Sequence, residues 1–225
     1  MHYSGTGVKW VPVTARLSTT SYAVLGLLAL RSWTGYELTQ QAQRSLAYCW
    51  PKEDSVLYEE PRRLAALGLA RAEQERDRGR TRNRYTITDA GRQALRDWLA
   101  TPSALPHLEL EPLLRLTFAD QGTLPDARAA IAALRDWAAT SLADGMTVLR
   151  GYQAGQAPFP DRMHINVLGA CYYKAIYDAT IAFCDLADKE IASWERTDGL
   201  GATQRTRDLL QQLLASAGGA SVKEP

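Results

Sequence analysis

The sequence is poor in cysteine and histidine and has no long hydrophobic run. Its three cysteines, Cys49, Cys171 and Cys184, form no Cys-x-x-Cys pair, and only three histidines are present. This spacing predicts reduced thiols, buried as small hydrophobic side chains, rather than a disulfide or a metal site. The longest apolar run, residues 22–30, is shorter than the roughly 20 residues that cross a bilayer, and residues 1–20 lack a signal-peptide core. We therefore expect a cytoplasmic protein with no membrane partner.

The motifs of common enzymes are missing as well. The sequence contains no Gly-rich phosphate loop, no His-Glu-x-x-His and no nucleophile elbow. Glu109 and Glu111 stand beside Pro112 and would point to different sides of a helix, so they are a poor pair for acid–base catalysis. We expect a protein that is not an enzyme, with no catalytic residues and no cofactor.

Charge is unevenly distributed along the chain, although the net charge is only +1. Residues 1–107 contain 15 Lys and Arg against 10 Asp and Glu, a balance of +5, whereas residues 108–225 contain 11 against 15, a balance of −4. A basic first half and an acidic second half predict two parts with different partners.

Three helices separated by strong breaks are expected in the first half. Ser18 precedes a dense apolar run and would cap a helix that ends near residue 30. A second helix is expected over residues 36–48, and Thr34 or Gly35 can cap it. Asp54 or Ser55 would cap the third helix, and Gly68 would end it as a C′ glycine. Its spacing directs four apolar side chains inward: Val56, Leu57, Leu64 and Leu67.

A hairpin over residues 70–87 follows these helices. Arginines at positions 80, 82 and 84 alternate with Tyr85 and Ile87, so strand geometry would place three guanidinium groups on one face. Residues 62–84 contain eight arginines against three acidic residues, a balance of +5, and no lysine. Arginine can fork onto phosphate or onto a guanine edge, so a wing that contacts DNA would use these groups. The alternative is a solvated hairpin whose charges protect the sheet edge from aggregation.

A basic ribbon directly after a tri-helical core favours double-stranded DNA as the partner. The third helix would enter the major groove, and the hairpin would lie over the backbone. The candidate DNA contacts are Ser55, Tyr58, Glu59, Arg62 and Arg63 in the helix and Arg76, Arg78, Arg80, Arg82 and Arg84 in the hairpin. Glu59 and Glu60 would repel phosphates, so they either accept from a cytosine amino group or pair with neighbouring arginines.

The second half predicts long helices. Residues 101–106 form a proline-containing linker, and helices are expected over residues 125–151, 161–194 and 203–217, with a loop over 151–160. Two long helices with wide apolar faces predict packing against a second copy of the chain. Candidates for that interface, or for a pocket that binds a small aromatic effector, are Trp137, His164, Cys171, Tyr172, Tyr173, Tyr177 and Trp194.

The expected fold is mainly α with a small β-hairpin: an N-terminal winged helix-turn-helix followed by a long-helix dimerisation domain. The expected divisions are a flexible arm over residues 1–18, the DNA-binding domain over 19–104, the dimerisation domain over 105–217 and a flexible tail over 218–225.

Several motifs in this order resemble the PadR family of bacterial transcription regulators. They are YAVLGLL at residues 22–28, GYEL at 35–38, SVLY at 55–58, RLAALGL at 63–69 and YTITDAG at 85–91. Residues 108–120 resemble the start of an AphA-like C-terminal helical domain, which the longer branch of the family carries. The resemblance implies a homodimer on a pseudo-palindromic operator, repression rather than activation, and response to a small aromatic molecule.

One departure from the family pattern concerns the third helix. The family places proline directly after the tyrosine of this helix, whereas here Glu59 and Glu60 separate Tyr58 from Pro61. A proline inside a helix removes the amide hydrogen bond to the carbonyl four residues earlier, so a kink or a late start of the helix is expected.

Winged helices also serve as protein-interaction modules, which is the alternative to DNA binding. The arginine-rich wing favours DNA, because a protein partner gains nothing from so many exposed cations.

Overall fold

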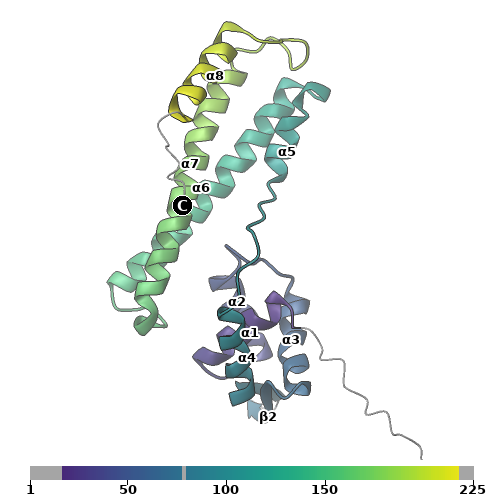
Figure 1. Cartoon of the computed structure of the whole chain (residues 1–225), viewed down its shortest axis with the longest axis vertical. Coiled ribbons are helices and arrows are strands. Elements are labelled where there is room, and N and C mark those ends of the chain that lie inside the picture. Colours follow the sequence, from purple (N-terminus) through teal and green to yellow (C-terminus); the bar gives the residue numbers. More distant parts are fainter. Residues whose placement is uncertain (1–16, 78–79, 218–225) are drawn as a thin grey trace, which may run out of the picture. The chain divides into compact units, whose positions relative to one another are not determined.

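The computed structural model describes residues 17–77 and 80–217, and the chain divides into two compact units, residues 1–106 and 107–225 (Figure 1). Most of the expected arm and all of the expected tail lie outside the described residues, as does Arg78. The fold is mostly helical with a small antiparallel sheet, which confirms the predicted fold class.

The first unit is a winged helix-turn-helix. In chain order its elements are α1 (Thr19–Leu30), β1 (Trp33–Thr34), α2 (Gly35–Ser45), α3 (Asp54–Ala66), β2 (Ala70–Asp77), β3 (Arg80–Ile87) and α4 (Asp89–Leu99). The sheet order is β1-β3-β2 with both pairs antiparallel. The short strand β1 falls where the sequence predicted only a break between helices.

Capping residues explain where the first two helices begin. Ser18 and Ser21 form a capping box at the start of α1, and Thr34 and Glu37 form another at the start of α2. Thr34, one of the two predicted caps, therefore holds this position. Helix α2 ends at Ser45, earlier than the predicted end at residue 48.

Helix α3 corrects three expectations. Its N-cap is Glu53, which makes no side-chain capping bond, so neither Asp54 nor Ser55 caps the helix. Val56 and Leu67 are 45% and 40% exposed instead of facing inward. Leu57 and Leu64 are buried as predicted.

Pro61 lies inside α3 and is fully buried. The helix begins seven residues before it, so the expected late start is wrong. Gly68 ends the helix as predicted, with φ at +73°. The amide of Leu69 donates to the carbonyl of Leu64 at 2.9 Å, and the amide of Gly68 donates to that of Ala65 at 3.0 Å, which is the Schellman pattern.

The core of the first unit lies between α1 and the sheet. Tyr85 and Ile87 on β3 are buried, and the indole Nε1 of buried Trp33 donates to the carbonyl of Leu27 at 2.7 Å. The rings of Tyr22 and Trp98 stack at 4.9 Å, which fixes α4 on α1.

The second unit is built on two long helices. Its elements are α5 (Glu111–Thr117), a 3-10 turn (Ala119–Gln121), α6 (Leu124–Gln153), a second 3-10 turn (Pro160–Arg162), α7 (Met163–Ile191) and α8 (Gln204–Ala217). Helices α6 and α7 lie side by side (Figure 1). The three long segments agree with the predicted helices to within a few residues, whereas α5 was not predicted.

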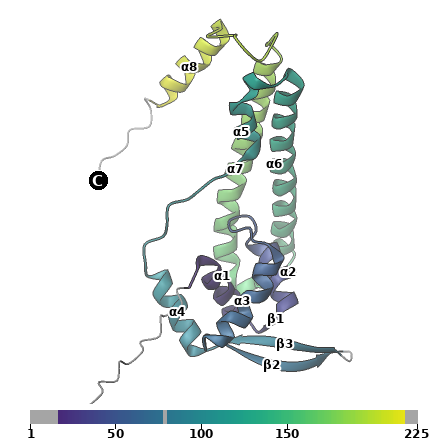
Figure 2. The same ribbon diagram turned by 90° about the vertical axis from the view of Figure 1, so that its right-hand side faces the viewer.

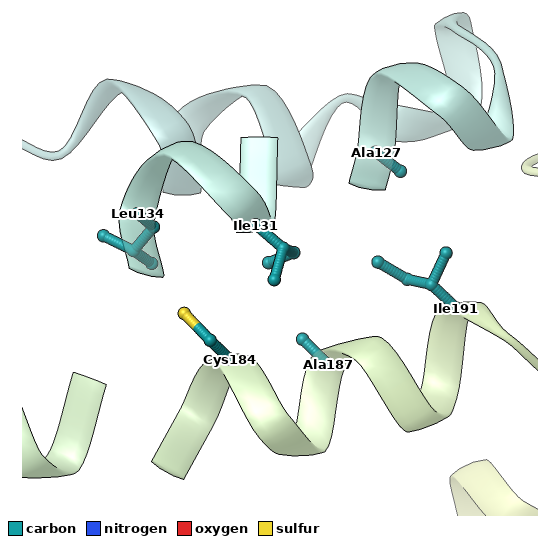
Figure 3. Packing of buried hydrophobic residues seen from close by; sticks show 6 residues of the cluster. All are labelled: Ala127, Ile131, Leu134, Cys184, Ala187 and Ile191. Atoms are coloured by element: carbon teal, nitrogen blue, oxygen red, sulfur yellow. The ribbon is translucent and has the colours of Figure 1, made fainter. Parts of the chain in front are cut away.

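The core of this unit joins α6 to α7. Figure 3 shows Ala127, Ile131 and Leu134 of α6 facing Cys184, Ala187 and Ile191 of α7. At its edge the guanidinium of Arg135 binds the carboxylates of Asp185 and Asp188 at 2.6 and 2.8 Å.

The cysteines differ from one another in burial. Cys184 is buried, and burial raises the pKa of its thiol. Cys49 and Cys171 are exposed, so the expectation that all three are buried is wrong for two of them. Among the described residues no helix is long and apolar enough to span a membrane.

Candidate nucleic-acid interface

The exposed surface between α2 and α3 is hollowed. Polar side chains from both helices line it: Tyr36, Thr39, Gln40, Gln43, Arg44, Asp54, Ser55, Tyr58 and Glu59. Tyr58 is 56% exposed, and its ring lies against the backbone of Gly35. A Cβ at position 35 would lie 3.1 Å from Cε2 of this ring, so glycine allows the tyrosine to pack closely on α2. Three of the predicted contacts, Ser55, Tyr58 and Glu59, are thus brought together.

Gln43 fixes the connection between the two helices. Its Nε2 donates to the carbonyl of Lys52 and to the carboxylate of Asp54, both at 2.8 Å. Asp54 therefore orients the start of α3 through a tertiary contact instead of a cap. Gln43, which the sequence pattern did not single out, thus links α2 to the start of α3.

A row of hydrogen-bonded side chains runs along the exposed side of α2. Gln40 donates to the Tyr36 hydroxyl at 2.8 Å, and Arg44 donates to the Gln40 side-chain oxygen at 3.3 Å. None of these three residues was predicted as a contact. Their spacing of four residues, which places them on one side of a helix, was the signal available in the sequence.

The two arginines of α3 have different surroundings. Arg62 is exposed and lies 3.8 Å from Glu59, which is also exposed. Arg63 binds the nearly buried carboxylate of Glu60 at 2.8 Å and donates to the Ser21 hydroxyl at 2.7 Å. Its hydrogen bond to Glu60 raises the pKa of Arg63. Arg63 thus joins α3 to α1, and both glutamates pair with neighbouring arginines.

Arg84 is held by several groups at the base of the hairpin. Its guanidinium binds both carboxylate oxygens of Glu75, at 2.6 and 3.0 Å, and donates to Glu37 and to the carbonyl of Ser32, both at 3.2 Å. The bond to Glu75, followed by the charges of Glu37 and Glu75, raises the pKa of Arg84 against the opposing effect of burial. The backbone amide of Thr34 and the charge of Arg84 lower the pKa of Glu37. Arg84 therefore joins β3 and β2 to the start of α2.

The remaining arginines of the hairpin are distributed over both faces. Arg82 on β3 and Arg76 on β2 are exposed and alternate to opposite faces. Arg78 and the side chain of Arg80 lie outside the described residues. The register places Glu75 opposite Arg82 and Glu73 opposite Arg84, so the face with the arginines also carries carboxylates.

The predicted residues of the second unit separate into three groups. Trp137 and Tyr177 meet edge to face at 5.3 Å, and Tyr173 stacks on Tyr177 at 6.4 Å. Tyr172 meets Tyr173 at 5.7 Å and is 64% exposed. Trp194 instead packs against the core shown in Figure 3. The two others, His164 and Cys171, are exposed on α7.

Comparisons with known proteins agree with this fold. The profile of the "Transcriptional regulator PadR-like family" matches residues 24–97. The negative transcriptional regulator PadR of Bacillus subtilis is 31% identical over 87 residues, which are 38% of this chain and 48% of that protein. The sequence match thus spans about half the length of this curated relative.

Solved structures match a larger part of the chain. B. subtilis PadR in complex with operator DNA has a TM-score of 0.65 at 20% identity and covers 77% of this chain and 99% of its own. Its complex with p-coumaric acid has a TM-score of 0.56 at 21% identity, with 76% and 99% covered. The Vibrio cholerae virulence activator AphA has a TM-score of 0.61 at 23% identity, with 78% and 99% covered. At these identities the likeness establishes the fold.

Proposed function

The chain belongs to the PadR-like family of transcriptional regulators through residues 24–97, and we propose on this premise that it binds double-stranded DNA sequence-specifically to regulate transcription. Members of this family are regulators rather than enzymes. The proposed active form is a homodimer on a pseudo-palindromic operator, and the proposed action is repression.

The observation that carries the proposal is the exposed surface of α2 and α3. Ser55, Tyr58 and Glu59 lie together there, and Arg62 is exposed one turn further along α3. Polar and guanidinium groups on one face of a helix are the groups that read base edges in the major groove. The complex of B. subtilis PadR with operator DNA supports the same use of this fold.

Arg63 and Arg84 have positioning roles in this proposal. Each is bound by carboxylates that lie within the winged helix, so a phosphate would have to compete with an existing ion pair. We assign DNA contact to Arg62 on α3, and we assign to Arg63 and Arg84 the task of holding α3 and the wing in place.

The proposed dimer rests on an apolar stripe along α7. Ile165, Leu168, Tyr172, Phe183 and Leu186 are between 36% and 74% exposed. At 3.6 residues per turn these positions fall on one side of the helix. A second copy of the chain would cover this stripe and bring two winged helices to one operator.

The proposed surface for a small planar effector is the partly exposed rings of Trp137 and Tyr173, which pack on buried Tyr177. The p-coumaric acid complex of B. subtilis PadR supports this ligand class.

Fluorescence anisotropy tests the proposal with the promoter DNA upstream of the protein's own gene and with a scrambled duplex. Tight binding that favours the promoter and weakens with salt supports a DNA-binding regulator, since log affinity falls by about 0.9 per neutralised phosphate for each unit of log salt. Failure to bind either duplex at low salt, with or without a phenolic acid, would contradict it and favour the alternative of a protein-interaction module.

A further inference from the structure

We propose that α8 is a strap that closes on α7 of its own chain and covers the C-terminal half of the α7 stripe, around Phe183 and Leu186. A closed strap and a second copy of the chain would compete for these two side chains. The competition rests on the proposed dimer, whereas the closure itself does not depend on it.

Helix α8 exposes the apolar side chains that a strap would use. Leu210, Leu213 and Leu214 are between 56% and 67% exposed and lie on one side of this 14-residue helix. Figure 2 shows α8 running back from the end of α7 and diverging from it. Leucines that gather on one side of a helix are typical of a surface that packs against another element.

An ion pair already joins the two helices near their connection. The guanidinium of Arg205, in the first turn of α8, binds the carboxylate of Glu190, in the last turn of α7. The Glu190 side chain is only 14% exposed. It follows Leu186 by four residues and therefore lies on the stripe side of α7. The ion pair thus anchors the start of α8 on the side that carries the stripe.

The spacing from this ion pair matches apolar positions on the two helices. Because α8 runs back along α7, a residue that follows Arg205 is level, in a closed strap, with one that precedes Glu190 by the same number. Leu209 follows by four and Leu186 precedes by four, while Leu213 follows by eight and Phe183 precedes by seven. The facing positions beyond the ion pair are all uncharged: Ala179, Ala182, Phe183 and Leu186 on α7 and Leu209, Gln212, Leu213 and Ser216 on α8.

The connection between the helices contains two glycines that can serve as a hinge. Gly199 and Gly201 have φ angles of +63° and +59°, a region that glycine occupies without strain. A Cβ at position 201 would meet no atom within 4 Å, so the backbone there is not held by close neighbours. Changes of backbone angle at a few such residues are enough to swing a helix. The hinge would let α8 close while its ion pair to α7 is kept.

Closure would lower the affinity of one copy for another. Phe183 and Leu186 are 36% and 41% exposed, and a closed strap would bury them under Leu209 and Leu213. A second copy that needs these side chains would bind only the open form. The apparent dissociation constant of the dimer is then the intrinsic value divided by the fraction of open chains.

A pair of introduced cysteines tests the closure. Ala179 and Ser216 are both exposed, face each other in the closed strap and lie eleven positions from Glu190 and Arg205 respectively. We expect Ala179→Cys with Ser216→Cys to form a disulfide within one chain on mild oxidation, seen as a faster monomer band on a non-reducing gel. Cys49→Ser and Cys171→Ser remove the exposed native thiols from this background.

The matched control is Ala179→Cys with Gln211→Cys, because Gln211 lies on the opposite side of α8 and should stay reduced. A disulfide-linked dimer from Ala179→Cys with Ser216→Cys would assign α8 to the second copy and overturn the strap. Equal oxidation of the two pairs, or of neither, would also overturn it.

Leu213→Arg tests the competition with a second copy. Its charge opposes burial under a closed strap, and the 67% exposure of Leu213 makes the change harmless to the fold. We expect the dissociation constant of the dimer, measured by sedimentation across a dilution series, to fall by about tenfold, the factor for a wild type with about one open chain in ten. Gln211→Arg adds the same charge on the opposite side of α8 and should leave this constant unchanged.

The two experiments separate the strap from the proposed dimer. A dissociation constant that is unchanged or larger in Leu213→Arg would overturn the competition, even with the disulfide formed. If neither wild type nor Leu213→Arg self-associates at any concentration, the proposed dimer fails and the competition fails with it, whereas the disulfide within one chain still reports on closure.

Discussion

At the scale of single residues, the surroundings of each arginine differ more than its position in the sequence indicates. Arg62 is about four-fifths exposed, whereas Arg84 is bound by two carboxylates and a carbonyl. The sequence predicts which residue types alternate along a strand. It does not predict which carboxylates of the partner strand lie across from them, because that depends on a register set by the hairpin.

Glu75→Gln should destabilise the first unit. The substitution removes the two-oxygen bond to the Arg84 guanidinium and leaves that partly buried cation with the longer bonds to Glu37 and to the carbonyl of Ser32. We expect the free energy of unfolding to fall by about 1 kcal/mol, the usual size for a partly exposed charge-assisted pair. Urea denaturation followed by circular dichroism measures the change.

Glu73→Gln is the matched control. Glu73 lies on the same strand and the same face but is 3.8 Å from Arg71, with both side chains exposed. This variant should change the free energy of unfolding by less than about 0.5 kcal/mol. Equal effects of the two substitutions would mean that Glu75 holds Arg84 no more firmly than a surface pair does.

At the scale of elements, local signals located most helices but not their contacts. The hydroxyl caps at Ser18 and Thr34 and the glycine at 68 were predicted from the sequence because caps and C′ glycines act within a few residues. The two-residue strand β1 was missed, since its pairing with β3 joins residues about 50 positions apart. Val56 and Leu67 were wrongly placed in the core because burial of a helical side chain also depends on which distant segments pack against the helix, and helical spacing does not indicate those segments.

The candidate site was predictable to a similar extent. Ser55, Tyr58 and Glu59 lie in one hollow, as their spacing on one helix indicates. The contribution of α2, through Tyr36 and Gln40, was not predicted, because only the packing of two helices brings those side chains to the site.

The capping box of α2 predicts an acid-sensitive element. The pKa of Glu37 is lowered in the folded protein by the Thr34 amide and by Arg84. A group whose pKa is lower in the folded state stabilises the fold at pH values above its unfolded pKa and loses this contribution as the pH falls through its folded pKa. We therefore expect wild type to lose more stability than Glu37→Gln between neutral pH and the acidic range below the ordinary pKa of a glutamate.

Urea denaturation at a series of pH values measures this difference. Glu59→Gln serves as the control, because Glu59 lies in a long, exposed ion pair with Arg62 and caps no helix. Identical pH profiles for wild type and Glu37→Gln would show that the carboxylate of Glu37 does not stabilise the start of α2.

At the scale of the whole molecule, the chain joins a basic unit to an acidic one. Residues 1–107 carry a balance of +5 and residues 108–225 a balance of −4. Each unit has a core of its own, in the first around Leu25, Trp33 and Tyr85 and in the second around Ile131 and Cys184. The acidic unit would be repelled by a polyanion, so its role in the proposed regulator is to join two copies of the chain.

Leu168→Arg tests that role. Leu168 is a member of the α7 stripe and is 74% exposed, so a charge there costs little in the isolated chain but would be buried in the proposed dimer. We expect the variant to sediment as a monomer with an unchanged melting temperature. Affinity for the promoter duplex should fall by at least about tenfold, because two linked winged helices bind one operator with a high effective concentration.

Gln153→Arg adds the same charge at the exposed C-terminal end of α6, outside the stripe, and should leave both the dimer and the DNA affinity unchanged. Analytical ultracentrifugation measures the oligomeric state of each variant, and fluorescence anisotropy on the same preparations measures its affinity for the promoter duplex. A Leu168→Arg protein that still sediments as a dimer would place the subunit contact elsewhere on the chain. A monomer that keeps full affinity would show that one winged helix is sufficient for DNA binding. The dependence of DNA affinity on self-association therefore distinguishes a regulator that binds as a dimer from one that binds as a monomer.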